Sequence, residues 1–283
     1  SKEGILHTTL AFVNPGDSVL VPNPGYPTYS SVSKLAEANI ITYDLLESNG
    51  WYPDFQQLES LPLEGVKLMW VNYPNMPTGT PANIDLFQKL IDFGKRHNIL
   101  IVNDNPYSFI LHKEQLSILS IPGAMEIALE MNSLSKANNM AGWRMGLIAG
   151  NAKYIEWILR VKSNIDSGQF RPMMKGAIQA MSLPDSWYSS LNDEYRKRRR
   201  VAEDIMNALG CQFDSNQAGL FLWGKIPDEI PEVEQFVDNI LYTKHVFITP
   251  GSIFGSNGDR YIRISLCSPV ESMKDALKRI TNK

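Results

Sequence analysis

Cysteine and histidine are scarce in this sequence. Its 283 residues include two cysteines, Cys211 and Cys267, and four scattered histidines. The cysteines lack a CxxC spacing, which argues against a disulfide scaffold and favours a reducing compartment, so we expect a cytoplasmic protein. The histidines show no paired spacing, so we expect no metal site.

Long hydrophobic runs and a strong charge of either sign are also lacking. No apolar segment approaches the ~20 residues that span a membrane, and the chain opens on polar residues rather than on a signal peptide. Lys and Arg number 27 against 30 Asp and Glu, and the resulting net charge of −3 excludes bulk attraction to nucleic acid or to an anionic membrane. The basic run at 196–200 is flanked by acidic residues, which is typical of a solvated helix face.

Short apolar runs alternate with helical patterns in the first two thirds of the chain. A helix with its N-cap at Asn83 lies between two of these runs. The strands are predicted at 19–21, 68–71, 99–102, 127–131 and 145–149. This alternation predicts an α/β fold with a largely parallel central sheet flanked by helices.

The last third of the chain has a different pattern. A charged amphipathic helix is predicted at 193–209. Strands follow at 219–223, 246–248 and 261–265. We therefore expect a large α/β domain over residues 1–190 and a smaller C-terminal α+β domain over residues 191–283.

A lysine follows two hydroxyl residues in a small polar segment, Ser133-Leu134-Ser135-Lys136, and Arg144 lies eight residues after the lysine. A lysine amine in such a setting can form an imine with an aldehyde cofactor. The hydroxyls and the guanidinium can hold a phosphate. Pyridoxal 5'-phosphate (PLP) needs this combination, because it has an aldehyde to anchor and a phosphate to bind.

The segment SLSKANNMAGWR, from Ser133 to Arg144, resembles the lysine signature of the class I and II aminotransferases, which are PLP-dependent enzymes of fold type I. The resemblance implies that fold and makes Lys136 the imine-forming residue and general base, with Ser133, Ser135 and Arg144 as phosphate ligands. The implied reaction moves an amino group from an L-amino acid to a 2-oxo acid. Among the branches of this family, the sequences of the motifs resemble most those of the LL-diaminopimelate and aspartate-type aminotransferases.

Other motifs of this family follow in order along the chain. The start SKEG is similar to the family's GSKEG, which implies phosphate binding by Ser1 and Lys2 through backbone amides at a helix start. The segment NPGYPTY is similar to PGYPTY, whose first tyrosine, here Tyr26, stacks on the cofactor ring. In DNPY, Asp104 is implied to pair with the ring nitrogen, and Tyr107 to donate to the ring oxygen and tune the imine.

Two further motifs concern the substrate and the ring oxygen. YIRIS near the C-terminus is similar to the family's YxRIS, which implies that Arg263 holds the substrate α-carboxylate. NYPNMPTG departs from the family's NYPNNPTG, because Met76 stands where an asparagine contacts the ring oxygen. A thioether cannot donate a normal hydrogen bond. We expect either that Asn75 substitutes for it or that the ring oxygen relies on Tyr107 alone.

The resemblance also implies a homodimer with shared active sites, in which the turn at 167–170 lies toward the partner. Compared with the family pattern, the chain is expected to begin mid-domain, without an N-terminal portion that supplies part of the small domain. Two alternatives stay open at this point. One is another fold type I activity, such as a C–S or β-lyase or a decarboxylase, and the other is a truncated, inactive remnant.

Overall fold

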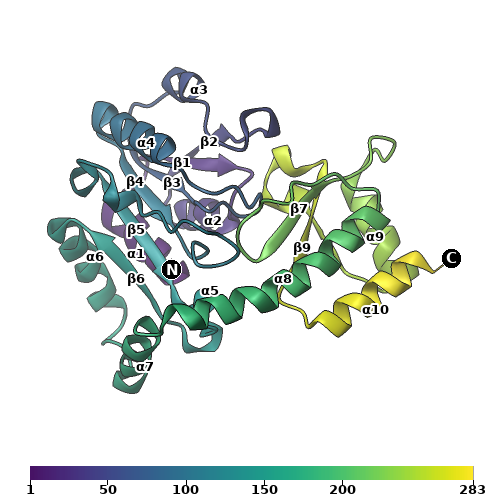
Figure 1. Cartoon of the computed structure of the whole chain (residues 1–283). Helices are drawn as coiled ribbons and strands as arrows, with labels where there is room; N and C mark the ends of the chain where they lie inside the picture. The colour runs from purple at the N-terminus through teal and green to yellow at the C-terminus, as the bar shows by residue number, and fades with distance from the viewer. Residues whose placement is uncertain (283) are drawn as a thin grey trace.

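The computed structural model describes residues 1–282 and contains two β-sheets (Figure 1). The large sheet has six strands in the order β2-β1-β3-β4-β5-β6, and the small sheet has three in the order β7-β9-β8. The strands are β1 Ser18–Asn23, β2 Asn39–Asp44, β3 Val66–Val71, β4 Leu100–Asp104, β5 Ala128–Ser133, β6 Gly146–Gly150, β7 Phe221–Lys225, β8 Thr249–Pro250 and β9 Tyr261–Ser265.

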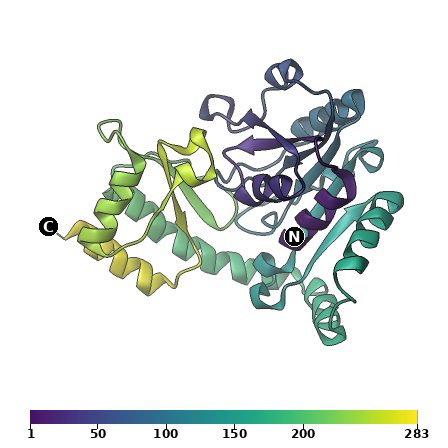
Figure 2. The ribbon, with the colours of Figure 1, turned by 180° about the vertical axis from the view of Figure 1, so that it is seen from behind.

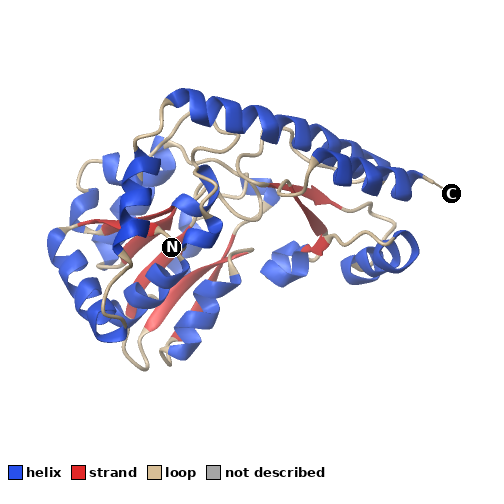
Figure 3. Ribbon diagram, turned by 90° about the horizontal axis from the view of Figure 1, so that it is seen from below, coloured by secondary structure: helices blue, strands red, loops and turns tan. Residues whose placement is uncertain are grey.

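Helices surround both sheets, as Figure 3 shows in blue against the red strands. The α-helices are α1 Lys2–Phe12, α2 Pro27–Leu35, α3 Phe55–Ser60, α4 Ile84–His97, α5 Leu134–Ala137, α6 Ala152–Ile165, α7 Arg171–Met181, α8 Asp185–Ala208, α9 Val233–Lys244 and α10 Val270–Thr281. The 3-10 helices are η1 Glu47–Asn49, η2 Ile118–Ser120, η3 Ala124–Glu126, η4 Ala141–Trp143, η5 Gly251–Phe254 and η6 Ser256–Gly258.

The large sheet is parallel from β1 to β5, and only β6 runs antiparallel, beside β5. Every residue of the central strand β4 is buried, because helices cover both faces of the sheet. The fold class predicted from the sequence, an α/β fold with a mostly parallel central sheet, is therefore confirmed.

The two faces of the large sheet carry separate hydrophobic cores, because successive strand residues point to opposite sides. On one face, Ile5 of α1 and Tyr29 of α2 pack with Trp70 of β3. Figure 2 shows α1 in purple and α6 in teal from this side. On the other face, Phe87 of α4 packs with Met69, the residue before Trp70. These layers fix the carboxyl ends of the strands in space.

Helix α8 runs from the large sheet to the small sheet (Figure 1). Its second half, including Ile205, packs with Leu222 of β7 and Ile262 of β9 in the core of the small lobe. The helix predicted at 193–209 is present but begins earlier, at Asp185. The predicted domain division after residue 190 falls inside this helix, and it stays a prediction.

One strand prediction is wrong, and one strand of the large sheet was not predicted. The strand predicted at 246–248 is wrong, because the ladder with β9 begins only at Thr249, and Phe247 is 72% exposed. Strand β2 was not predicted, since it lies at the edge of the sheet and five of its six residues are exposed or only partly buried. In the part of the chain that the structure describes, no helix is both long and apolar enough to cross a membrane.

Candidate active site

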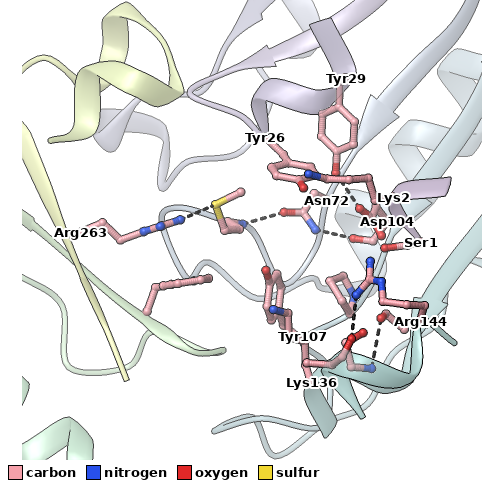
Figure 4. Close-up of a pocket in the computed structure, with 16 residues that line it drawn as sticks. Ser1, Lys2, Tyr26, Tyr29, Asn72, Asp104, Tyr107, Lys136, Arg144 and Arg263 are labelled. Atoms are coloured by element: carbon pink, nitrogen blue, oxygen red, sulfur yellow. Dashed lines mark hydrogen bonds between the residues drawn. The ribbon is translucent and has the colours of Figure 1, made fainter. Parts of the chain in front are cut away.

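A cavity of about 380 Å³ lies where β4 and β5 end, and residues from both sheets line it (Figure 4). In open α/β sheets, ligands bind at this edge. All but one of the predicted site residues line the cavity: Ser1, Lys2, Tyr26, Asp104, Tyr107, Ser133, Ser135, Lys136, Arg144 and Arg263. The exception is Asn75. Segments that are far apart in the sequence thus converge on one space.

Asp104 is the last residue of β4 and is almost fully buried. Its Oδ2 accepts a hydrogen bond from the hydroxyl of Tyr29 at 3.2 Å, whereas its Oδ1 is buried without a partner among the described residues. Burial raises the pKa of Asp104, and the positive charge of the Ser1 amine, followed by hydrogen bonding from Ser1 and from Tyr29, opposes that shift. The unpartnered oxygen is therefore an acceptor that a cationic N–H donor can satisfy.

Tyr29 was not predicted from the sequence, although it stands three residues after Tyr26 in the same motif. Its ring stacks on Trp70, with centroids 5.1 Å apart and planes 4° from parallel, and meets the ring of Tyr26 edge-on at 5.6 Å. Burial raises the pKa of Tyr29 well above its usual value, so the hydroxyl stays protonated and can only donate to Asp104. Tyr29 thus orients the carboxylate from a rigid aromatic support.

Asn75 was predicted to reach the cofactor, but its side chain is used within its own turn. Its Oδ1 accepts from the hydroxyl of Thr78 at 2.8 Å, and its Nδ2 donates to the carbonyl of Asn72 at 3.2 Å. The geometry therefore removes Asn75 from the cavity, because a side chain bound in this way has little left to offer a ligand.

Asn72, which was not predicted, lines the cavity instead. Its Nδ2 donates to the carbonyl oxygen of Asp104, and its Oδ1 accepts from the backbone N–H of Met76 at 2.7 Å. Asn72 follows β3 directly in the motif that contains Asn75, so the motif located the right segment but not the right amide.

The hydroxyl and guanidinium groups of the lysine segment gather at one end of the cavity (Figure 4). Ser133 caps α5, and its Oγ accepts from the backbone N–H of Ser135 at 3.2 Å. Arg144 donates through Nη1 to the carbonyl of Ala141 at 2.8 Å, which leaves its other N–H groups for an anion. Ser1 and Lys2 at the start of α1 line the same cavity, and the first N–H groups of a helix have no intrahelical acceptor.

Four basic residues of the cavity have no carboxylate partner among the described residues. None of the ion pairs formed there includes Lys2, Lys136, Arg144 or Arg263. The cavity thus contains uncompensated positive charge, and Asp104 is the one carboxylate among its described lining residues. Such a site attracts anionic ligands.

Arg263 extends from β9 at the opposite end of the cavity from Lys136 and Arg144 (Figure 4). Its guanidinium carbon lies 4.0 Å from the ring centroid of Phe221 and 4.6 Å from that of Phe254. Burial lowers the pKa of Arg263 to about 10, and its Nε is buried without a partner among the described residues. A planar cation that lies against two aromatic rings and has an unpartnered N–H is suited to bind a carboxylate.

Two tyrosines complete the walls. Tyr107 is buried, burial raises its pKa, and its ring centroid lies 6.0 Å from that of Phe221. The phenol therefore stays protonated and can act as a donor. Tyr26 sits at the start of α2, with the ammonium of Lys2 5.5 Å from its ring centroid. Phe221, like Asn72 and Tyr29, lines the cavity without having been predicted.

The sequence profile of aminotransferase class I and II matches residues 1–280 of this chain. The chain belongs to that aminotransferase family. An LL-diaminopimelate aminotransferase from Aquifex aeolicus is 38% identical over 284 residues, which cover 100% of this chain and 73% of the relative. A second protein of that name, from Oleidesulfovibrio alaskensis, is 39% identical over 100% of this chain and 73% of its own length.

Solved structures agree with this assignment to the aminotransferases. BacF from Bacillus subtilis superposes with a TM-score of 0.94 at 36% identity, over 99% of this chain and 72% of that one. An aminotransferase from Staphylococcus aureus has a TM-score of 0.91 at 30% identity, over 99% of this chain and 74% of that one. The family resemblance found in the sequence motifs is thereby confirmed, and the activity is that of an aminotransferase.

Proposed function

We propose that this aminotransferase uses PLP, bound in the cavity described above, to move an amino group from an L-amino acid to a 2-oxo acid. The observation that supports the proposal most is the convergence of Lys136, Asp104 and Arg263 on one cavity. These residues supply an amine, a carboxylate and a carboxylate-binding cation, and each comes from a different part of the chain.

The residues present fit PLP at both ends of the molecule. Asp104 has a buried oxygen without a partner, which suits a protonated ring nitrogen. Lys136 has an amine without a carboxylate partner among the described residues, which suits the aldehyde. Ser133, Ser135 and Arg144 provide hydroxyl, backbone and guanidinium donors for the phosphate, which is doubly charged near neutral pH.

The start of α1 adds to the phosphate site. Ser1 and Lys2 line the cavity, and the helix that follows places the positive end of its dipole there. We assign these two residues a role through their backbone N–H groups. Tyr26, which lines the cavity on the same side, is assigned to stack on the ring.

When bound, PLP supplies an aldehyde that condenses with the substrate amine and a ring that withdraws electrons from the α-carbon. Arg263 binds the substrate α-carboxylate through two N–H groups and so fixes the α-carbon in the cavity. With the substrate amine on the cofactor, Lys136 would be free to take the α-proton on its Nζ as general base and to return it to the cofactor as the amino group is transferred. Asp104 would keep the ring nitrogen protonated, and Tyr107 would donate to the ring oxygen.

The proposal is tested by reduction of the PLP-treated, full-length protein with borohydride, followed by peptide mapping. We expect the reduced adduct on Lys136 and none in Lys136→Ala. An adduct on another lysine, or transamination that persists undiminished in Lys136→Ala, would contradict the assignment. Product analysis separates the reaction from elimination, since a 2-oxo acid with pyridoxamine phosphate indicates transamination and pyruvate with ammonia indicates a lyase.

We also propose that the enzyme is a homodimer whose active sites are shared. Large apolar side chains are exposed at the end of the lysine motif and along the segments that follow it: Trp143, Leu147, Phe170, Met174, Ile178 and Met181. Beneath them, Leu134 of α5 packs with Ala177 of α7. Because α5 also carries Lys136, a second copy bound to this surface would lie next to the segment that contains the lysine. Sedimentation equilibrium should give twice the chain mass, and Ile178→Lys should shift the protein toward monomer. A monomeric wild type would reject this proposal.

The remaining assignments concern domains and location. We propose a division near residue 190, with the small lobe built on the core of β7, β9, α8 and α10. We also propose a cytoplasmic location, which is consistent with the free thiols of Cys211 and Cys267. Limited proteolysis tests the first, since a stable fragment ending near α8 is expected, and cell fractionation tests the second.

A further inference from the structure

Glu130 is a buried carboxylate that the mechanism above does not use. It lies in β5 and is only 8% exposed. None of the ion pairs formed among the described residues includes it. A buried carboxylate without a cation needs hydrogen-bond donors in place of water, so the donors around Glu130 indicate its role.

The donors of Glu130 come from the two ends of one loop, at 105–117. Its Oε1 accepts a hydrogen bond from Nδ2 of Asn105 at 2.7 Å. Its Oε2 accepts from the hydroxyl of Ser117 and, at 2.8 Å, from the backbone N–H of Ile118. Asn105 directly follows β4, and Ile118 begins η2. One carboxylate therefore holds the place where the loop leaves the large sheet and the place where it returns.

The loop at 105–117 carries Tyr107, the tyrosine that we assign to the ring oxygen of PLP. Two residues before it, Asn105 is bound to β5 twice, because its backbone N–H donates to the carbonyl of Met131 at 2.8 Å and its side chain donates to Glu130. Strand β5 also leads directly into α5, which holds Lys136. The same strand thus places the lysine and, through Glu130, the tyrosine.

The middle of this loop is bound to another part of the molecule. The carbonyl of Ile110 accepts from the backbone N–H of Gly219, just before β7, at 2.8 Å. The side chain of Asn192 in α8 binds two backbone groups of the loop, at 2.7 and 2.9 Å. Without the carboxylate, the tyrosine would be placed by these contacts and by one backbone hydrogen bond to β5.

We infer that Glu130 is a positioning residue, which acts through the loop at 105–117 to keep the hydroxyl of Tyr107 within hydrogen-bonding reach of the ring oxygen of PLP. The inference rests on the proposed function, because it takes PLP to be bound in the cavity and joined to Lys136. A hydrogen bond weakens steeply as its geometry is lost, so a small displacement of the phenol is enough to remove the donor.

The first measurement is a pH titration of the visible absorbance of the PLP-loaded, full-length protein, which reports the pKa of the adduct with Lys136. The negative ring oxygen depends most on a donor when the adduct has lost its own proton, so loss of the donor raises this pKa. Tyr107→Phe removes the donor itself and sets the reference shift. We expect Glu130→Ala to raise the pKa by at least about half of that reference.

Glu130→Gln is the conservative variant, which keeps the side-chain length and removes the charge. Its oxygen can accept from Ser117 and Ile118. Its amide nitrogen can donate to Oδ1 of Asn105, which is buried without a partner among the described residues, once the amide of Asn105 is reversed. Both ends of the loop then remain bound, so we expect the pKa of the adduct to shift by less than about a fifth of the reference.

The second measurement needs no cofactor. In hydrogen–deuterium exchange on the cofactor-free, full-length protein, the peptide containing Ile118 should exchange at least about tenfold faster in Glu130→Ala than in wild type, because its N–H loses an acceptor. If Glu130→Ala does not fold, Ser117→Ala removes one donor and should raise the pKa of the adduct. Ser120→Ala is its matched control and should not, because the hydroxyl of Ser120 donates to a backbone carbonyl.

A wild-type pKa in Glu130→Ala, where Tyr107→Phe does shift it, would overturn the inference, and a loss of stability alone would not rescue it. An equal shift in Glu130→Gln and Glu130→Ala would also overturn it, since the charge and not the hydrogen bonds would then act on the cofactor. A failure of the proposed function looks different. In that case, wild type forms no titratable adduct that Lys136→Ala abolishes.

Discussion

Replacing Asp104 by asparagine should stabilise the cofactor-free protein and weaken its binding of PLP. Burial raises the pKa of Asp104 in the folded state, so ionising it there is harder than in the unfolded chain. Below the ordinary aspartate pKa of about 3.9 both states are protonated and the penalty is absent. The penalty grows as the pH rises toward the folded pKa and is complete above it.

The gain comes from the buried charge that asparagine removes. The amide keeps a polar atom where the unpartnered Oδ1 of Asp104 lies, but it has no charge to desolvate. We expect Asp104→Asn to raise the free energy of unfolding of the cofactor-free, full-length protein by about 1–3 kcal/mol at pH 7.5, and by less at pH 4.5. Urea unfolding at the two pH values measures this. PLP affinity should fall at least about tenfold, because a neutral amide is a weaker acceptor for a protonated ring nitrogen.

Asp44 offers a matched control in the same sheet. It ends β2 as Asp104 ends β4, but its carboxylate accepts from the side-chain amides of Asn23, Gln57 and Asn257 at 3.1, 3.2 and 2.8 Å. Asp44→Asn should therefore lose stability at pH 7.5, since it sets amide donors against another amide. If Asp104→Asn were destabilised as much as Asp44→Asn, or if its effect did not depend on pH, the account of the buried carboxylate would be refuted.

Three other perturbations test separate parts of the structure. Asn72→Ala should lower the free energy of unfolding by about 1–3 kcal/mol in urea titrations, because it leaves the buried carbonyl of Asp104 without that donor; no loss would show the bond to be unimportant. Gly79→Ala should lower the melting temperature, because φ is +74° there and a Cβ would come within 2.5 Å of a neighbouring side chain; an unchanged melting temperature would contradict this. Cys267 should react rapidly with a thiol reagent at pH 7.5, and Cys211 only on unfolding, since burial raises the pKa of Cys211 to about 12; two fast thiols would refute the assignment.

The strands that were predicted correctly from the sequence are those whose apolar pattern follows directly from their burial in the sheet. Strand β4 is a continuous run of buried apolar residues between helices, and such a run can be read directly from the sequence. Strand β2 has polar residues in a partly exposed position at the sheet edge, so its pairing with β1 decides its structure. The run at 246–248 has strong strand propensity but no partner strand, because this segment of the chain pairs with β9 only from Thr249 onward.

The candidate site follows the same rule. Residues fixed by a motif and by the end of a strand, such as Asp104 and Lys136, were predicted to share a site and do line one cavity. Asn75 and Asn72 lie in one turn and are the same residue type. The sequence therefore does not show which of the two side-chain amides forms its hydrogen bonds within the turn and which faces the cavity. The answer depends on the hydrogen bonds of Thr78 and Met76, which exist only in the folded turn.

The cavity joins residues from opposite ends of the sequence, since Lys2 and Arg263 both line it. Bringing together such distant residues closes a very long loop, whose entropic cost rises with length, and long-range contacts slow folding. The strands β1 to β5 can pair during synthesis before β9 has been made. A ligand that needs both ends of the cavity therefore cannot guide the early steps of folding, and its binding reports a molecule whose assembly is already complete.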